Sequence, residues 1–390
     1  MIKKLLLLAT TFSFAQSVTK TINVLPDTGQ TSSYTSTFGE DNDYNINAPS
    51  YTNNADGTIT DNITGLQWQQ ADGGEMTIEN ATNYSENLIL GGFSDWRLPS
   101  PIESFSILNH QNNNPAMNTA FFTPSAAEYW WTNTYQAGDN NKVWCTNAGG
   151  GIGNHPKSET ISAGGIKKFH VRAVRNRVNP TTIPNHFTDN GDGTITDNLT
   201  QLIWQKTPNS TAQTWENALV YADNLSLANA SDWRLPNIKE LQSLNDESRT
   251  NPSTNTVFFP AIGVHNYWSS TSLPNQTTKA WYWNTQFGIT TYDVKSNTNY
   301  VICVKGNPVP LAVNLPIKPE DNKVYPNPFS NFIHFENENY NENYILLDNS
   351  GAIIYKGTNI ENHDFTNLAK GIYFLKSANL KSTVIKLIKE

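Results

Sequence analysis

The chain has 390 residues, of which 37% are hydrophobic and 15% charged, and its formal net charge is −8. This length predicts two or three domains, and the apolar and aromatic content is sufficient for packed cores, which excludes a globally disordered chain. The negative charge gives no electrostatic reason to bind nucleic acid or an anionic membrane, so neither is expected as a partner.

The N-terminus has the features of an export signal in residues 1–15. Lys3 and Lys4 precede a short apolar run that ends in the small-x-small triplet Ser13–Ala15. That run is too short to span a bilayer, and no later segment has 18 consecutive apolar residues, so we expect no transmembrane segment. Residues 16–50 are rich in Thr, Ser, Asn and Asp and predict an irregular N-terminal arm.

The central part of the chain is a tandem duplication. The segment Tyr51–Gln70 aligns with Phe187–Lys206, and the hexapeptide SDWRLP occurs at both Ser94–Pro99 and Ser231–Pro236. The copies end in the related strings VRAVRN and VICVKG. We therefore expect repeat 1 at residues 51–177, a linker at 178–186 and repeat 2 at 187–306, each repeat being the size of a whole domain.

Each repeat predicts the same order of elements. A β-hairpin turns at Asp56-Gly57 in repeat 1 and at Asp192-Gly193 in repeat 2. A helix capped by Thr214 follows, and a second helix starts at a capping box formed by Asn237 and Glu240, or by Ser100 and Glu103 in repeat 1. Aromatic and β-branched strands complete the repeat. The predicted fold class is α+β.

The Asp-Gly hairpin also invites comparison with a calcium loop. Glycines fall where a loop starting at Asp189 needs oxygen ligands, at Gly191 and Gly193. A hairpin turn is the favoured interpretation, so the sequence predicts no cofactor and no metal. Calcium stays open as an alternative that no motif supports.

The end of the chain has a different character. A Pro-rich linker is expected at residues 307–323, and residues 324–390 predict a small all-β sandwich. This last segment resembles the type A C-terminal sorting domain of the type IX secretion system of Bacteroidetes, on Tyr325, Pro326, Asn327 and Pro328, the turn before Gly351 and the string LAKGIY. The resemblance implies contact with the secretion machinery and a secreted or outer cell-surface location.

The two repeats resemble the Lcl C-terminal domain family along nearly their whole length. The motifs that carry the resemblance are DGTITDN, SDWRLP and the closing VICVKG. The family is similar in fold to C-type lectin domains, so the resemblance implies two tandem C-type-lectin-like domains. It also implies a non-catalytic adhesion protein whose partner is a glycan or surface polysaccharide. A protein-binding surface module and a polysaccharide-modifying enzyme are the alternatives.

The hexapeptide SDWRLP has two interpretations. In the first, the Arg binds a ligand beside a stacking Trp. In the second, which we favour, Trp and Leu fill the core of each repeat, and the Arg pairs with the neighbouring Asp or caps helix carbonyls. The residues assigned this structural role are Asp95, Trp96, Arg97, Asp232, Trp233 and Arg234.

Aromatic residues in the strand-rich half are the best candidates for sugar contacts, because an exposed ring offers a sugar a flat apolar platform. They include Tyr135 and Tyr292. The basic string ending in HVRAVRNR offers a second candidate, for an anionic glycan. The predicted ligand-binding residues are Trp144, Asn147, Lys168, His170, Arg172, Trp281, Trp283, Asn284 and Gln286. For any single aromatic, core packing is the competing interpretation.

Catalysis can be judged from the duplication, because a mechanism shared by both copies needs its reactive groups in both. No His occupies equivalent positions, Cys145 faces Tyr282, and Cys303 faces Ala173. This argues against Cys/His or Ser/His/Asp chemistry and against a His/Cys zinc site. The non-equivalent cysteines also argue against a disulfide framework. We therefore expect no enzyme.

Overall fold

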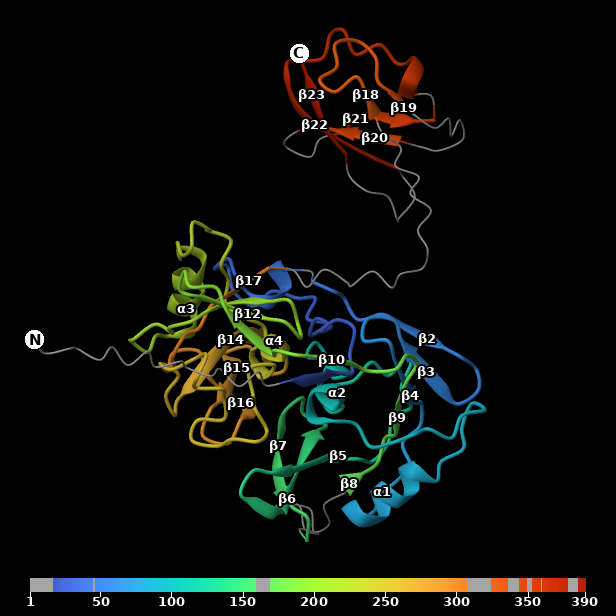
Figure 1. Cartoon of the computed structure of the whole chain (residues 1–390), viewed down its shortest axis with the longest axis vertical. Coiled ribbons are helices and arrows are strands. Elements are labelled where there is room, and N and C mark those ends of the chain that lie inside the picture. The colour runs from blue at the N-terminus through green and yellow to red at the C-terminus, as the bar shows by residue number, and fades with distance from the viewer. Residues whose placement is uncertain are drawn as a thin grey trace, which may run out of the picture. The chain divides into compact units, whose positions relative to one another are not determined.

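The computed structural model describes residues 17–44, 46–158, 169–306, 324–335, 344–348, 353–358, 360–377 and 385–390. The expected export signal and the expected linker at 307–323 lie outside these residues. The chain divides into two compact units, residues 1–311 and 312–390, and each is described by itself. Figure 1 shows the elements of both units.

Repeat 1 contains two short helices and two sheets, in which every strand pair is antiparallel except β5 with β8. The first sheet has the order β2-β3-β4-β9 and the second the order β7-β6-β5-β8. The strands are β2 Tyr51–Asn53, β3 Thr58–Asp61, β4 Leu66–Gln69, β5 Tyr129–Gln136, β6 Asp139–Asn147, β7 Ile152–Pro156, β8 Phe169–His170 and β9 Val174–Asn176. The helices are α1 Ile78–Glu86 and α2 Pro101–Ser106.

Repeat 2 has the same arrangement. Its sheets have the orders β11-β12-β13-β17 and β14-β15-β16. The strands are β11 Phe187–Asp189, β12 Thr194–Asp197, β13 Ile203–Gln205, β14 Asn266–Ser272, β15 Lys279–Asn284, β16 Ile289–Val294 and β17 Val304–Lys305. The helices are α3 Trp215–Asp223 and α4 Ile238–Gln242.

Local sequence signals account for these elements. The predicted hairpins are present, and Oδ1 of Asp56 accepts hydrogen bonds from the backbone and hydroxyl of Thr58, which fixes the turn. The helices α2 and α4 begin at the predicted capping boxes of Ser100 and Asn237. The helices are short, so the described residues of both repeats are mostly β-sheet. The helical content is lower than the predicted α+β fold class implied.

The two repeats share one hydrophobic core. Figure 1 shows α2 and α4 in the middle of the unit and β7 beside β16. Equivalent elements of the two repeats therefore face each other, as in the isologous interface of a two-fold dimer. The buried residues at this interface are Phe105, Leu108, Trp144, Ile152, Ile238, Leu273 and Trp281. Trp144 and Trp281 occupy the same position in their repeats.

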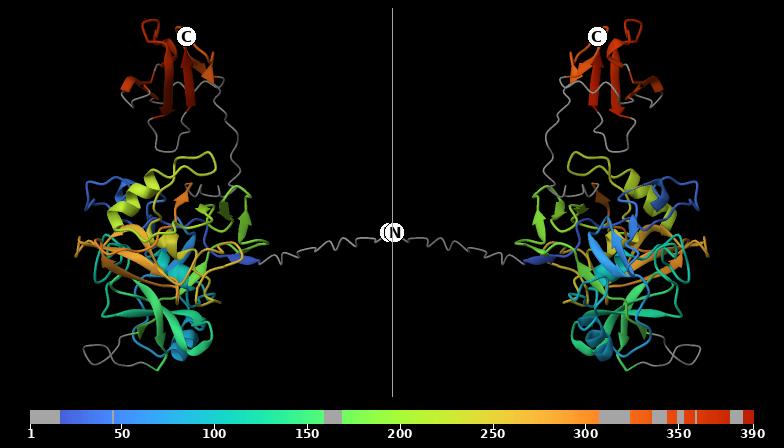
Figure 2. Two further views of the ribbon diagram at one scale, coloured as in Figure 1. Left: turned by 90° about the vertical axis from the view of Figure 1, so that its left-hand side faces the viewer. Right: turned by 90° about the vertical axis from the view of Figure 1, so that its right-hand side faces the viewer.

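The predicted N-terminal arm packs against both repeats. It has little regular structure apart from β1 (Val18–Lys20) and the 3-10 helix η1 (Asp41–Asp43). β1 pairs with β10 (Thr181–Ile183), which lies inside the expected linker at 178–186. Ile22 and Leu25 belong to the core of repeat 1. The two views in Figure 2 place the blue arm beside α3 of repeat 2, where the hydroxyl of Thr35 donates to Glu216.

Carboxylates of the arm are buried against polar groups of repeat 2. Oδ2 of Asp41 accepts from the hydroxyls of Thr28 and Thr271, at 2.8 and 2.6 Å. Glu40 accepts from the hydroxyl of Ser272. Asp27 accepts from Nδ2 of Asn237 at 3.1 Å. These hydrogen bonds satisfy acidic groups that would otherwise be costly to bury.

A buried lysine joins the arm to both repeats. Lys239 of α4 is 1% exposed, and its Nζ donates to the backbone oxygens of Asp27 and Ser106, at 2.8 and 2.7 Å. Burial lowers the pKa of Lys239 to about 8, against the opposing pull of nearby carboxylates. Burial likewise raises the pKa of Asp27 to about 6 and that of Asp41 well above its ordinary value.

The C-terminal unit is all β in its described residues apart from one 3-10 turn, η2 (Ile360–Asn362). A four-stranded sheet has the order β21-β20-β22-β23, and a second sheet pairs β18 with β19. The strands are β18 Val324–Tyr325, β19 His334–Phe335, β20 Tyr344–Leu347, β21 Ile353–Gly357, β22 Gly371–Ser377 and β23 Ile385–Lys389. Phe329, Phe365 and Leu387 are among its core residues. Across the described part of the chain, no helix combines the length and apolarity needed to cross a bilayer.

The shared core predicts that the two repeats unfold together. Trp144→Ala removes a side chain that is 1% exposed, and we expect a loss of about 3–5 kcal/mol in the free energy of unfolding. Tyr135→Ala, at a ring that is 40% exposed, is the control and is expected to cost about 1 kcal/mol or less. Calorimetry of the full chain should show one transition for both repeats that shifts as a whole. Two transitions, of which only one shifts, would mean independent repeats.

The raised pKa of Asp27 predicts that the free energy of unfolding depends on pH. Because its pKa is about 6 when folded and lies above the ordinary value of 3.8, the folded state holds this proton more tightly than the unfolded chain. The resulting stabilisation is fully present below about pH 4 and is lost as the pH rises through 6. Denaturant titrations should therefore show the stability of the wild type falling relative to Asp27→Asn between pH 4 and 7. A constant difference would contradict the assignment.

Candidate functional site

A cleft of about 450 Å³ lies where the two repeats meet. Repeat 1 contributes Asn114, Glu128, Asn147 and the glycine turn at 149–151, and repeat 2 contributes Trp281, Thr291 and Tyr292. We call it the inter-repeat cleft. Its aromatic, amide, hydroxyl and carboxylate groups match the mixture of flat apolar surface and convergent polar groups that small-ligand sites use.

The glycine turn, whose Gly149 and Gly151 line the cleft, allows repeat 1 to approach repeat 2 closely, because a side chain has no room at Gly150. Gly150 has φ +103°, and a Cβ atom at this position would lie 3.2 Å from Ala116 and 3.3 Å from the Trp281 ring. Oδ1 of Asn147 accepts from the backbone of Gly149 and Gly151, at 3.0 and 3.1 Å, and so fixes the turn. Repeat 2 carries Gln286 and Phe287 at the positions equivalent to Gly149 and Gly150.

The cleft is also lined by an exposed ring from repeat 2 and by a carboxylate residue from repeat 1. Tyr292 is 40% exposed and meets the Trp281 ring edge-on, with 5.6 Å between the centroids. Glu128 directly precedes β5, and its backbone oxygen accepts from Ala148 at 2.9 Å. Its Oε2 is buried and has no hydrogen-bond partner among the described residues. The cleft is therefore lined by an exposed aromatic ring and by a glutamate, one of whose carboxylate oxygens has no hydrogen bond among the described residues.

Of the three predicted ligand-binding tryptophans, Trp144 and Trp283 lie in the interior and offer no surface to a sugar, whereas Trp281 lines the inter-repeat cleft. Trp144 fills the inter-repeat core, and Trp283 is fully buried in the core of repeat 2. Trp281 is 3% exposed and presents only an edge to the cleft. Alternation along β15 put Trp281 and Trp283 on one face, and the two repeats together bury that face.

The predicted polar residues separate into two places. Asn147 lines the inter-repeat cleft. Asn284 occupies the equivalent position of repeat 2, where its Nδ2 donates to Asn266 at 2.8 Å and its Oδ1 accepts from the backbone of Gln286 at 3.1 Å. Gln286 is exposed in the turn between β15 and β16. Asn284 and Gln286 are not among the residues that line the inter-repeat cleft.

The basic string does not form a ligand surface. Lys168 lies outside the described residues, whereas His170 and Arg172 are 7% and 2% exposed. Nδ1 of His170 lies 2.9 Å from Oδ1 of Asp72, and Nη1 of Arg172 donates to the backbone oxygens of Gln69 and Gln70. The expected face for an anionic glycan is wrong because Asp72, which the sequence analysis did not single out, takes both side chains into the interior.

These contacts shift the ionisation of the cluster. Burial acts to raise the pKa of Asp72, but hydrogen bonds from His170 and Ser125 and the charge of Arg172 outweigh it and hold that pKa well below its ordinary value. Burial lowers the pKa of Arg172 to about 10. The cluster is thus an internal ion network that ties β8 and the following segment to the residues after β4.

The Trp and Leu of SDWRLP lie in the interior of each repeat, whereas its Ser and Asp are exposed. Trp96 and Trp233 are 3% and 2% exposed. The expected pairing of each Arg with the neighbouring Asp is wrong. Arg97 binds Glu103 through two hydrogen bonds of 2.8 and 2.7 Å, and Arg234 binds Glu240 through two of 2.6 Å. The partner is the capping-box glutamate, whose carboxylate the helix start already orients.

The two Asp residues of the hexapeptide have other partners. Asp95 accepts from Nε of Arg175 at 2.6 Å, and Asp232 lies 3.9 Å from Nζ of Lys305. Both pairs connect the hexapeptide to the closing strand of its own repeat.

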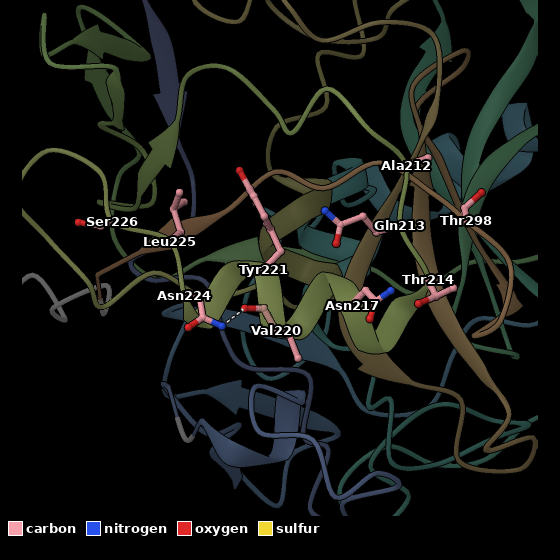
Figure 3. A pocket seen from close by; sticks show the side chains of 10 residues that line it. All are labelled: Ala212, Gln213, Thr214, Asn217, Val220, Tyr221, Asn224, Leu225, Ser226 and Thr298. Carbon is pink, nitrogen blue, oxygen red and sulfur yellow. Dashed lines mark hydrogen bonds between the residues drawn. The ribbon is translucent and has the colours of Figure 1, made fainter.

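A second, open groove of about 570 Å³ follows α3 of repeat 2 (Figure 3). Its lining combines apolar and amide side chains, with Val220, Tyr221 and Leu225 beside Asn217 and Asn224. Val220 is 47% exposed. The hydroxyl of Tyr221 already accepts from Gln205 at 3.0 Å.

Metal and cysteine chemistry find little support in the described residues. Within the described ranges, no group of three or more His, Cys, Asp or Glu is arranged to hold a metal ion. Cys145 and Cys303 lie in different cores of the described chain and are not joined to each other. Burial raises the pKa of the Cys303 thiol far above its ordinary value.

The sequence analysis missed Glu128, Asn114 and the arm carboxylates. One available signal was the run Gly149–Gly151, which repeat 2 lacks and which predicts a close approach of backbone to a neighbour. Glu128 carried no such signal, because only the packing of repeat 2 against repeat 1 creates the cleft around it.

The fold and the comparisons together define an exported protein built from duplicated β-rich domains. Residues 57–175 and 193–305 match the Lcl C-terminal domain, so the chain belongs to that family. Residues 323–390 match the secretion system C-terminal sorting domain. The chain is therefore a type IX secretion substrate that reaches the cell surface or the medium, as the sequence predicted. Tyr325, Pro326, Asn327 and Pro328 lie at the start of this matched segment.

One solved structure similar to the chain is PorZ, described as an essential bacterial surface component of the type-IX secretion system of Porphyromonas gingivalis. The identity is 16%, and the match covers 66% of this chain and only 30% of that one, with a TM-score of 0.16. So low a TM-score does not indicate a common fold. No curated protein matches the chain.

The glycine turn predicts a specific pattern of stability losses. Gly150→Ala forces an alanine into a left-handed conformation and against Ala116 and Trp281, with an expected cost of about 3 kcal/mol. Gly138 has φ +74°, and no atom lies within 4 Å of the place where a Cβ would be added. Gly138→Ala therefore isolates the backbone strain and should cost about 1 kcal/mol. Chemical denaturation measures both. Equal losses would mean that the contact with Trp281 does not constrain the turn.

Proposed function

We propose that this chain is a non-catalytic surface or secreted adhesion protein that recognises glycans in the inter-repeat cleft. The observation that carries the proposal is that the exposed Tyr292 ring and the amides of Asn114 and Asn147 line one cleft. A ring provides an apolar platform for a sugar face, while amides and hydroxyls exchange hydrogen bonds with sugar hydroxyls.

Kinship in fold with C-type lectin domains is part of this proposal. The two short helices and two sheets of each repeat are compatible with it. The calcium-independent form of recognition is favoured, because Glu128 is the only carboxylate among the described residues that line the cleft.

The absence of a second carboxylate in that lining also supports binding without bond cleavage. Glycoside hydrolysis ordinarily requires two carboxylates that flank the scissile bond. The described lining residues of the inter-repeat cleft supply Glu128 alone. The enzyme alternative therefore has weaker support than recognition.

A protein-binding surface module remains the alternative, and the groove along α3 is the feature that favours it. Exposed Val220 and the neighbouring Leu225 offer an apolar strip for a protein partner. A glycan ligand for the inter-repeat cleft would separate the two functions.

The first experiment compares two tyrosines of equal exposure. Tyr292→Ala should lower the affinity of the full chain for the best ligand on an array of neutral, amino and sulfated oligosaccharides by about tenfold or more. Tyr135→Ala, in repeat 1, should leave that affinity unchanged, since both rings are 40% exposed and only Tyr292 lines the cleft. Equal effects would place the glycan elsewhere. No binding by the folded chain would favour the protein-binding alternative.

A further inference from the structure

The charge of the inter-repeat cleft restricts the kind of glycan that it accepts. Glu128 is the only charged side chain among the described residues that line it. We infer that the cleft selects neutral or amino-bearing glycans against sulfated or carboxylated ones, with Glu128 as the specificity-determining residue. This inference rests on the proposed function and names the ligand class of the same site.

One oxygen of the Glu128 carboxylate lacks the hydrogen bond that a buried acceptor ordinarily has. Its Oε2 is buried from water and has no hydrogen-bond partner among the described residues. An acceptor oxygen without a hydrogen bond gains from a donor that enters its surroundings. A hydroxyl or ammonium group of a sugar supplies such a donor, whereas a sulfate or carboxylate supplies only acceptors.

The position of Glu128 brings this charge close to the polar groups that would hold a sugar. Glu128 is directly followed by Tyr129, which pairs with Asn147 in the register between β5 and β6. The backbone oxygen of Glu128 is fixed by Ala148, which follows Asn147. A sugar that contacts Asn147 therefore lies near the backbone of Glu128, and repulsion between like charges is stronger in a partly buried cleft than in bulk water.

The nearest cation on the platform side does not line the cleft. Nζ of Lys279 lies 5.0 Å from the centroid of the Tyr292 ring, so its charge is directed at the ring face. The net charge of −8 adds long-range repulsion toward a polyanion. Both the local and the overall electrostatics thus disfavour acidic polysaccharides.

The duplication supplies a matched control for Glu128. The equivalent residue of repeat 2 is His265, whose ring stacks on Tyr300 with 4.1 Å between the centroids. His265 is not one of the residues that line the inter-repeat cleft. A substitution there changes the corresponding place in the other repeat while the cleft itself is left intact.

The test uses the full chain and three oligosaccharides of equal length: chitosan (amino-bearing), its fully N-acetylated form (neutral) and heparin (polyanionic). We expect calorimetry at physiological salt to detect binding of the first two and none of heparin. Glu128→Gln should weaken chitosan binding by about tenfold and leave the neutral oligosaccharide within twofold. His265→Gln should change neither, and thermal unfolding checks that all variants are folded.

Each contrary outcome has a distinct meaning. Heparin binding that Tyr292→Ala abolishes would overturn the inference while the proposed function stands. An unchanged chitosan affinity in Glu128→Gln would remove Glu128 from its assigned role. Failure of all three oligosaccharides to bind the folded chain would overturn the inference together with the proposed function.

Discussion

The buried ammonium of Lys239 is the contact on which the arrangement of the larger unit depends. It extends from α4 of repeat 2 to a backbone oxygen of the arm and to another of repeat 1. Three separate segments thus meet at one cation. An ammonium without acceptors is too costly to bury, so each segment must be in place before the site is stable. The carboxylates of Asp27 and Asp41 contribute to its electrostatic surroundings, and the junction acts together with the shared apolar cluster to hold the two repeats against each other.

The repeated hexapeptide has its role within each repeat, separately from this junction. Trp and Leu of SDWRLP enter the core of each repeat, and the Arg binds the glutamate that also caps the following helix. One carboxylate therefore serves the helix start and the ion pair together, since Glu240 accepts from the backbone of Asn237 as well as from Arg234. Each copy needs its own set, because neither repeat can supply these contacts to the other.

The features that could be predicted from the sequence are those that depend on neighbouring residues along the chain. Hairpins at Asp-Gly turns, the capping boxes of Ser100 and Asn237, and the strand-rich second half of each repeat all follow from local patterns. It did not predict the burial of the arm, because a segment rich in Ser, Thr and Asn gives no periodic signal and is stabilised by partners more than 200 residues away, such as Thr271. The burial of Trp144 and Trp281 escaped prediction for the same reason, because each is covered by the other repeat.

The two repeats have diverged where they meet and where a ligand would enter, while the positions that build each domain are retained. Trp144 and Trp281 remain equivalent and fill the shared core from both sides. Around them the copies differ: the glycines at 149 and 150 face Gln286 and Phe287, and Glu128 faces His265. A symmetric dimer of identical repeats would carry two identical clefts. Fusion of the copies into one chain frees each side to change alone, and an uncompensated carboxylate beside an exposed ring is then present on one side only. This asymmetry agrees with the single site proposed above, which residues of both repeats line.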